Sequence, residues 1–342
     1  MPPLRRAMPA AYLMPVLLAG VGLAALAALL LGSADLTPSR ILSALWDGLR
    51  GQTTDETAAR IVLGIRLPRI VLALAIGSSM GLAGLAAQTL FRNPLASPYV
   101  LGVSNGAAVG AVVAMLVAGK SLGYAAVPAM SVAGGLVVSA AVFALSRRSD
   151  HFGHSLLLAG IAISAFCSAL TAAALYLAGE RLQTLVFWLM GGLWQATWRD
   201  VMLMLPVTAT AFIGLLFLAP AMNVALVGER SAGDLGVNVR QFQILLLLTI
   251  CVTTAVAVAV SGVIGFVGLI VPHLLRMLLG ADHRGLVPAS AAGGALLLLV
   301  ADTLARTLAA PAEIPVGIIT SLVGAPIFLW FLQRRASGGG WA

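Results

Sequence analysis

A carboxylate and a guanidinium lie within one apolar run near the end of this sequence. Asp302 and Arg306 are four residues apart, so on a helix they share a face and can form an ion pair. An ionisable group inside a membrane-length run is by default a candidate for function. The local ion pair explains Asp302 well, and no further acid lies in the middle of another run to couple transport to protons. We therefore interpret Asp302 as structural.

Other residue types that often carry chemistry show no matching pattern. The four histidines lack the spacing of metal ligands; they are His151, His154, His273 and His283. The two cysteines are isolated in apolar runs, which is typical of small core residues; they are Cys167 and Cys251. A mid-membrane enzyme would need a base close to a serine, and the candidate histidines lie near the ends of runs. We predict neither a catalytic residue nor a metal site.

The tripeptide Gly119-Lys120-Ser121 resembles part of a phosphate-binding loop. That loop also needs a glycine five residues before Gly119, and position 114 is Ala114. It further requires a strand before it and a helix after it in water, whereas this segment ends an apolar run. The sequence therefore predicts no nucleotide site, and the energy for any transport must come from a partner or a gradient.

A charged segment, GERSAGDLGVNVRQ (228–241), separates two long uncharged runs. Ala232 and Leu235 have helical spacing, Gly236 stands where a left-handed residue ends a helix, and Asn238 precedes Gln241 as in a capping box. We predict a short helix, a glycine stop and the start of a second helix. Such a segment is either a docking site for a soluble partner or an ordinary polar connector.

The composition indicates an integral membrane protein. Of the 342 residues, 60% are hydrophobic and only 9% are charged, against about 25% charged in a soluble domain. The net charge of +8 comes from cations scattered singly at the ends of apolar runs, where arginines anchor helices at the bilayer surface. We predict no nucleic-acid partner.

Hydropathy predicts an all-α polytopic fold of about ten membrane-spanning helices, since each needs about 20 apolar residues. The predicted spans are 10–32, 66–91, 98–118, 124–146, 155–178, 199–219, 242–262, 263–280, 286–309 and 315–333. The boundary at 262/263 rests only on the glycines of SGVIGFVG (261–268). Glycines with small-xxx-small spacing predict close helix packing; they are Gly77, Gly81, Gly102, Gly106 and Gly110.

Loop charges favour cytoplasmic termini, because that orientation puts 11 of the 20 Lys and Arg residues on the inner side. The longest outer segment, 33–65, contains Thr37 before Pro38, which is typical of a helix start. Its apolar residues recur at helical spacing and predict a helix on the outer surface; they are Ile41, Leu42, Leu45 and Leu49.

From about residue 60 to 333, the chain resembles the permease subunits of ABC importers for iron chelates, haem and cobalamin (FecCD-type). The resemblance rests on motifs in family order, among them RLPRIVLALAIGSSMGLAGLAAQTLFRNPLASPYVLG (66–102), GERSAGDLGV (228–237), GFVGLIVPHLLRMLLGADHRGLVP (265–288) and EIPVGIITSLVGAPIFLWFL (313–332). It implies one permease domain, 1–342: a first span and outer segment (1–60), a family core (61–333) and a cytoplasmic tail (334–342).

The resemblance implies a homodimer around a central pore in the bacterial inner membrane. Two ATPase subunits would bind ATP and Mg²⁺, leaving no cofactor on this chain, and a periplasmic binding protein would deliver the cargo. The implied cargo is an iron complex, a ferric siderophore or haem. Cobalamin is the alternative within the family, and a gradient-driven carrier is a distant one.

The resemblance also implies three groups of site residues. The ATPase-coupling residues are Glu229, Arg230, Ser231, Ala232, Asp234, Leu235 and Gly236. Carboxylates of the binding protein would dock on Arg66, Arg69 and Arg306, since guanidinium groups pair well with carboxylates. The pore and gate residues are Gly153, His154, Ser155, Ser164, Ser168, Thr320 and Ser321.

Overall fold

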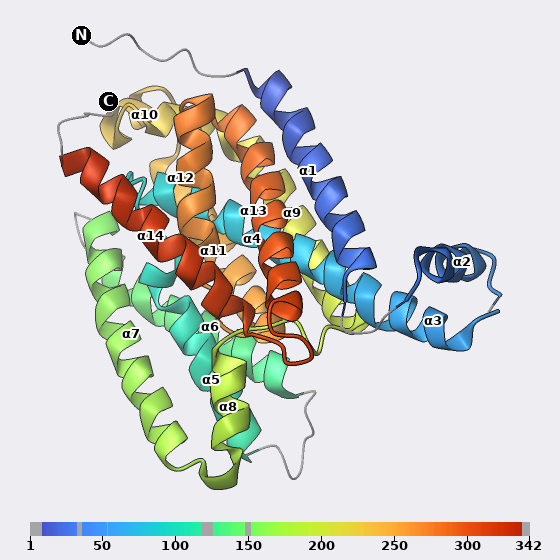
Figure 1. The fold of residues 1–342 in the computed structure, drawn as a ribbon. Coiled ribbons are helices and arrows are strands. Elements are labelled where there is room, and N and C mark those ends of the chain that lie inside the picture. The colour runs from blue at the N-terminus through green and yellow to red at the C-terminus, as the bar shows by residue number, and fades with distance from the viewer. Residues whose placement is uncertain (1–8, 33–35, 53, 118–125, 148–151, 337–342) are drawn as a thin grey trace.

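The computed structural model describes all residues except 1–8, 33–35, 53, 118–125, 148–151 and 337–342, and every regular element in the described part is a helix (Figure 1). The longer helices are α1 (Ala10–Leu30), α4 (Leu67–Leu90), α5 (Val103–Val117), α6 (Ala126–Ser146), α7 (Phe152–Tyr176), α9 (Trp198–Ala225), α11 (Val239–Ser261), α12 (Val267–Leu279), α13 (His283–Thr307) and α14 (Val316–Ala336). The shorter ones are α2 (Pro38–Leu49), α3 (Glu56–Ile61), α8 (Leu182–Leu189) and α10 (Glu229–Asp234), with single turns at Val62–Arg66, Pro98–Leu101 and Gly179–Arg181. The predicted all-α class is confirmed.

Seven helices of the described chain are long and apolar enough to cross a membrane. Helices α5 and α12 and the apolar part of α14 are shorter than about 20 residues. Together these ten helices match the ten predicted spans in order, although ten crossings stay a prediction. The largest differences are at the second span, where α3, the turn after it and α4 form one continuous helical run from Glu56 to Leu90, and at α9, which continues to Ala225. The Gly119-Lys120-Ser121 tripeptide lies outside the described residues.

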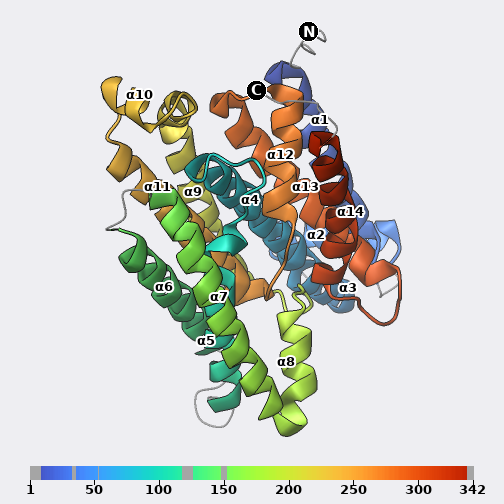
Figure 2. The same ribbon diagram turned by 90° about the vertical axis from the view of Figure 1, so that its left-hand side faces the viewer.

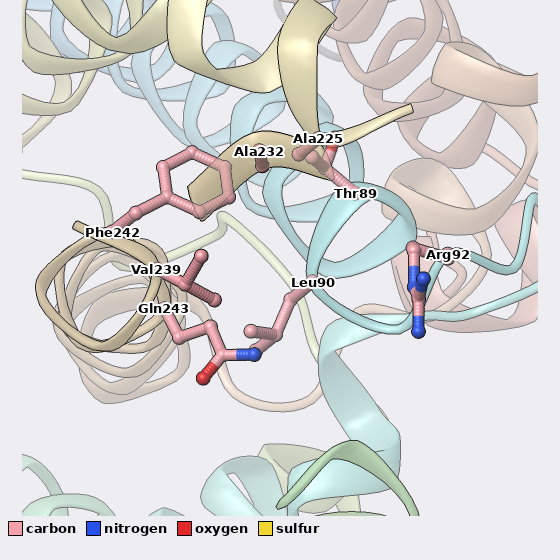
Figure 3. Close-up of a pocket in the computed structure, with 8 residues that line it drawn as sticks. All are labelled: Thr89, Leu90, Arg92, Ala225, Ala232, Val239, Phe242 and Gln243. Atoms are coloured by element: carbon pink, nitrogen blue, oxygen red, sulfur yellow. The ribbon is translucent and has the colours of Figure 1, made fainter. Parts of the chain in front are cut away.

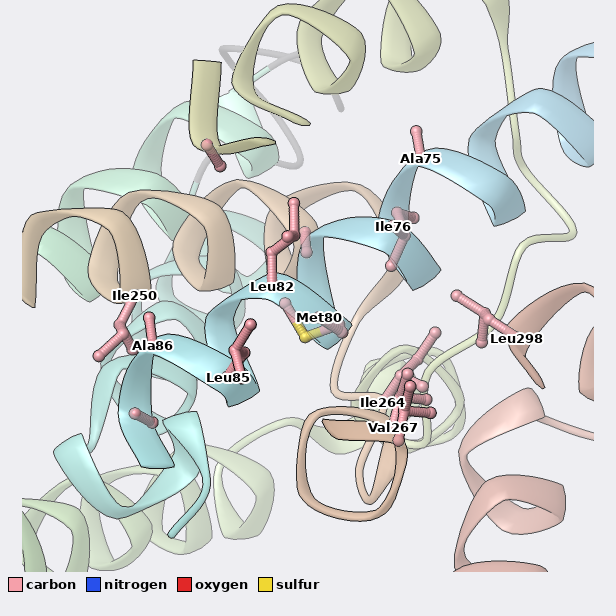
Figure 4. Close-up of a cluster of buried hydrophobic side chains, with 14 of the residues drawn as sticks. Ala75, Ile76, Met80, Leu82, Leu85, Ala86, Ile250, Ile264, Val267 and Leu298 are labelled. Carbon is pink, nitrogen blue, oxygen red and sulfur yellow. The ribbon is translucent and has the colours of Figure 1, made fainter. Parts of the chain in front are cut away.

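Helix α4 is the centre of the bundle. It contacts α9, α11, α12 and α13, and only a few of its side chains reach the surface. Figure 4 shows Leu82 and Leu85 of α4 within a cluster that also contains Ile250 of α11 and Leu298 of α13. A helix that is apolar all round is buried by neighbours on every side. Helix α4 is therefore the common packing partner that positions α9, α11, α12 and α13.

Close packing around α4 depends on glycine. A methyl group added at Gly77 would lie 2.3 Å from the carbonyl oxygen of Gly294 on α13, and one at Gly84 would lie 1.8 Å from that of Gly268 on α12. Only a residue without a side chain permits such approaches. The predicted packing role of Gly77 and Gly81 is confirmed, since Gly81 approaches Ser290 in the same way.

The turn between α11 and α12 lies where the glycines of 261–268 predicted it. Helix α11 ends at Ser261, Gly262 has φ +67°, and α12 starts at Val267 after Phe266, whose φ is +66°. Two residues in the left-handed region reverse the chain within five residues, and a non-glycine residue there is uncommon. The boundary between these two helices is therefore confirmed.

Two further predictions can be compared with the structure. Cys167 and Cys251 are buried and unbonded to each other, as expected of small core residues. The outer segment forms α2 with Pro38 at its first position. Of its apolar residues, Ile41 packs inward while Leu42 and Leu49 are exposed. The helical period identified the helix correctly but did not determine which flank its neighbours cover.

Candidate functional site

The charged segment between α9 and α11 folds as predicted. Helix α10 is bounded by two glycines with positive φ, Gly228 at +124° and Gly236 at +86°. The backbone N–H of Val237 donates to the carbonyl of Ala232 at 3.0 Å, which is the bond that closes a helix ending in a left-handed glycine. Asn238 Oδ1 then accepts from the Gln241 N–H at 3.0 Å and caps α11.

Helix α10 has one buried anchor and one exposed edge. Ala232 is 2% exposed, whereas Leu235 is 68% exposed and Asp234 is also on the surface. Ser231 is half-buried and Gly236 exposed; Glu229 and Arg230 belong to the helix, but their side chains lie outside the described set. Leu235 thus lies beside an acid on the surface of a short helix at the end of the bundle (Figures 1 and 2). Whether α10 is a docking surface or a connector stays a prediction.

A small cavity of about 20 Å³ lies beneath Ala232. Figure 3 shows Leu90 and Arg92 at the end of α4 on one side and Phe242 of α11 on the other. The space is about that of one water molecule, and α10 packs against α9 and α11 beside it. A displacement of α10 would therefore reach α4 through α9 and α11, which both pack against α4.

A hydrogen-bonded cluster ties the same end of the bundle together. The backbone N–H and Nδ1 of His283 lie 2.8 Å from Asn223 Oδ1, and its Nε2 lies 3.0 Å from Thr89 Oγ1. Asn223 Nδ2 donates to Asp282 at 2.7 Å. His283 and Thr89 are buried and Asp282 is exposed, so the cluster joins α4, α9 and α13 from the bundle interior to its surface. Sequence reasoning missed it, because Thr89, Asn223 and His283 lie 60 to 194 residues apart.

Arginines and carboxylates cluster at the opposite end of α4. Arg69 donates to Asp302 through Nε, at 3.0 and 3.1 Å, and through Nη2, at 2.9 Å. Its Nη1 donates to both oxygens of Glu313 at 3.0 Å. The predicted pairing of Asp302 with Arg306 is wrong: Arg306 Nη2 instead donates to the Ala28 carbonyl at the end of α1.

The three predicted docking arginines are buried in this cluster. Arg66, Arg69 and Arg306 are 3%, 6% and 5% exposed, and Arg66 Nη1 donates to the Leu29 carbonyl at 2.6 Å. Arg66 and Arg306 thus cap two successive carbonyls at the C-terminal end of α1, where helix carbonyls lack partners. The structure brings the three arginines together, and their docking role stays a prediction.

The predicted pore and gate residues fall on two helices. Gly153, His154, Ser155, Ser164 and Ser168 lie on α7, and Thr320 and Ser321 lie on α14. His154 and Ser168 are exposed, and Thr320 is buried with its hydroxyl donating to the Gly317 carbonyl at 3.2 Å. Most of α7 is uncovered, with buried positions only at Leu156, Gly160 and Cys167. Its pore-lining role stays a prediction.

Comparison with known proteins finds one family throughout. The sequence model of the FecCD transport family matches residues 19–334. The chain is 46% identical over 330 residues to the hemin transport system permease protein HmuU of Yersinia pestis, covering 94% of this chain and 96% of the relative. It is 45% identical over 281 residues to the cobalamin import system permease protein BtuC of Halobacterium salinarum, covering 82% and 75%.

Two further matches agree. The chain is 40% identical over 280 residues to the Fe(3+) dicitrate transport system permease protein FecC of Escherichia coli, covering 80% of this chain and 83% of the relative. A solved structure of a metal-chelate type ABC transporter in an inward-facing conformation superposes with a TM-score of 0.83 at 32% identity, covering 94% of this chain and 99% of the other.

Proposed function

This chain belongs to the FecCD transport family, and on that premise we propose that it moves an iron complex, a ferric siderophore or haem, from periplasm to cytoplasm. It is a multi-pass inner-membrane permease of an ABC importer, and a partner ATPase hydrolyses the ATP. ATP and Mg²⁺ are therefore bound by that partner, and the permease needs no cofactor of its own. Importer action also implies a substrate-binding protein that delivers the cargo.

The observation that carries the proposal is the seating of α10. Its buried Ala232 lies on the cavity at the ends of α4, α9 and α11, and its exposed Leu235 is available to a groove of the ATPase. Coupling between sites at opposite ends of a bundle is carried by packed, rigid elements that connect them. Helix α4 is that element, because it runs from the cavity to the arginine cluster.

The remaining parts of the proposal rest on the resemblance to the family and on the loop charges. The chain works as a homodimer with ten spans per copy and cytoplasmic termini, and α7 and α14 line the shared pore. The start of α1 and the end of α14 lie towards the α10 end of the bundle (Figures 1 and 2), in keeping with that topology. The arginine cluster at the opposite end faces the binding protein, whose carboxylates would compete with Glu313 for Arg69.

Haem is the first candidate cargo, because the hemin permease relative and this chain match over nearly their full lengths. Cobalamin is the second candidate, supported by the BtuC relative. Proteoliposomes with the ATPase and the binding protein, supplied separately with haem, a ferric siderophore and cyanocobalamin, distinguish them. ATP-dependent uptake of cyanocobalamin alone would overturn the iron assignment.

The coupling role is tested by Leu235→Asp in the reconstituted transporter, with Leu235→Met as the matched control. A charge in an apolar seat costs far more than a methionine of similar size. We expect Leu235→Asp to abolish uptake while Leu235→Met transports normally. Uptake at the parent rate with Leu235→Asp would show that α10 is a connector. Accumulation by vesicles that contain this subunit alone, without nucleotide, would refute the importer assignment.

A further inference from the structure

Helix α2 exposes a stripe of large apolar side chains. Leu42, Trp46 and Leu49 are 69%, 55% and 83% exposed, and their spacing of four and three residues places them on one side of the helix. Scattered apolar residues on a surface need no explanation, but a contiguous stripe marks an interaction surface. The stripe therefore needs a partner.

The stripe is separate from the face of α2 that packs into the protein. A different face of α2 is already packed, with Ile41 and Ala44 each 2% exposed against Ala58 of α3 and Val62 of the following turn. That small cluster orients the helix. With 100° per residue, the stripe lies on the flank next to the packed face, so the contact with α3 cannot cover it.

The other flank of α2 is polar and held in place. Arg40 Nη2 forms an ion pair with Asp55 Oδ2 at 2.7 Å, on the side of the helix away from the stripe. Arg50 stands between the two flanks, with its guanidinium carbon 4.6 Å from the centre of the Trp46 ring. An apolar stripe, an opposite charged flank and a cation at their border are the pattern of a helix lying in a bilayer surface.

The position of α2 favours lipid over a protein partner. Helix α1 precedes it directly and exposes Leu23 and Leu26 at 69% and 54%, as expected of a lipid-facing span. In Figure 1, α2 and α3 stand out sideways from the bundle beyond the end of α1. Trp198, at the start of α9, donates its indole N–H to the Leu63 carbonyl at 2.9 Å; tryptophans are enriched at this level of a membrane.

We propose that α2 lies along the bilayer surface at the end of α1. Its stripe enters the boundary between headgroups and acyl chains, and Arg50 meets the lipid phosphates. The apolar surface that α1 presents to the membrane thereby continues onto α2. This placement holds whichever side of the membrane that end of the bundle faces, so it does not depend on the cargo or on the coupling mechanism.

The test measures which side of α2 touches lipid. Cysteine is placed singly on the stripe (Leu42→Cys or Leu49→Cys) or on the polar side (Ser43→Cys or Asp47→Cys), and labelled with a small fluorophore in the full chain in phospholipid nanodiscs. The parent chain, whose cysteines are buried, gives the labelling background. Quenching is compared between a lipid with a nitroxide near its headgroup and aqueous iodide.

We expect stripe labels to show a ratio of lipid to iodide quenching several-fold higher than labels on the polar side. Equal ratios at the two sides would overturn the proposal. So would stripe labels that are open to iodide in nanodiscs and become protected only when the binding protein is added, because the surface would then belong to that protein.

Discussion

Replacing Asp302 with Asn would leave the buried guanidinium of Arg69 without its main carboxylate partner. The carboxylate of Asp302 is 0% exposed and accepts three hydrogen bonds from Arg69, whose own side chain is 8% exposed. Asp302→Asn keeps the size of the side chain and removes its charge. The guanidinium of Arg69 then keeps a single ion pair, with Glu313, whose side chain is 30% exposed.

Breaking a buried ion pair by removing one partner costs about 3–5 kcal/mol, because it leaves an uncompensated charge. At about 1.4 kcal/mol per tenfold, the unfolding equilibrium constant should rise by roughly two to four powers of ten. Glu313→Gln is the matched control on the same guanidinium. Since Glu313 is partly solvated, its pair is worth about 0.2–1 kcal/mol.

The assay is reversible unfolding of the purified chain by SDS in mixed micelles, followed by circular dichroism. A second variant separates charge from packing: Arg69→Met combined with Asp302→Leu removes both charges, and such replacements are often neutral or stabilising. The double variant should therefore be clearly more stable than Asp302→Asn. The reasoning is refuted if Asp302→Asn costs no more than Glu313→Gln, or if the double variant is as unstable as Asp302→Asn.

Three other predictions use the same preparation. Gly84→Ala should lower the free energy of unfolding by about 1–3 kcal/mol, because its methyl group would overlap the α12 backbone. Gly22→Ala has open space around it and should lower the free energy of unfolding by nothing measurable. Equal losses in the two variants would contradict the packing argument. His283→Ala should cost about 1–3 kcal/mol, because it leaves buried partners unpaired, and a melting temperature equal to that of the parent would show that the cluster is dispensable. The pKa of Asp282 lies below its ordinary value mainly because Asn223 donates to its carboxylate; its stabilisation is therefore present above about pH 3.9 and is lost as pH falls through the depressed value. Thermal unfolding in acid should consequently be less pH-dependent in Asp282→Asn than in the parent chain, and identical profiles would contradict this.

Local patterns sufficed for part of the architecture and for α10. Apolar runs located ten helices, and Gly236 and Asn238 marked the end of α10 and the start of α11, because caps and turns depend on residues only a few positions apart. The same patterns were misleading for Asp302. Its neighbour Arg306 has the right spacing for an ion pair, yet α1 ends beside Arg306 and Arg69 comes from a helix 233 residues away.

The sequence by itself determined the membrane-spanning character, the order of the helices and the existence of the charged helix α10, since each depends on local composition and period. Only the tertiary structure decided which charges meet, that Thr89, Asn223 and His283 join three helices, and which flank of α2 stays uncovered. The contacts between α4 and its neighbours depend on how closely the helices approach one another at glycine. Such distances are set by the packing of whole helices against one another, and no spacing along a single chain records them.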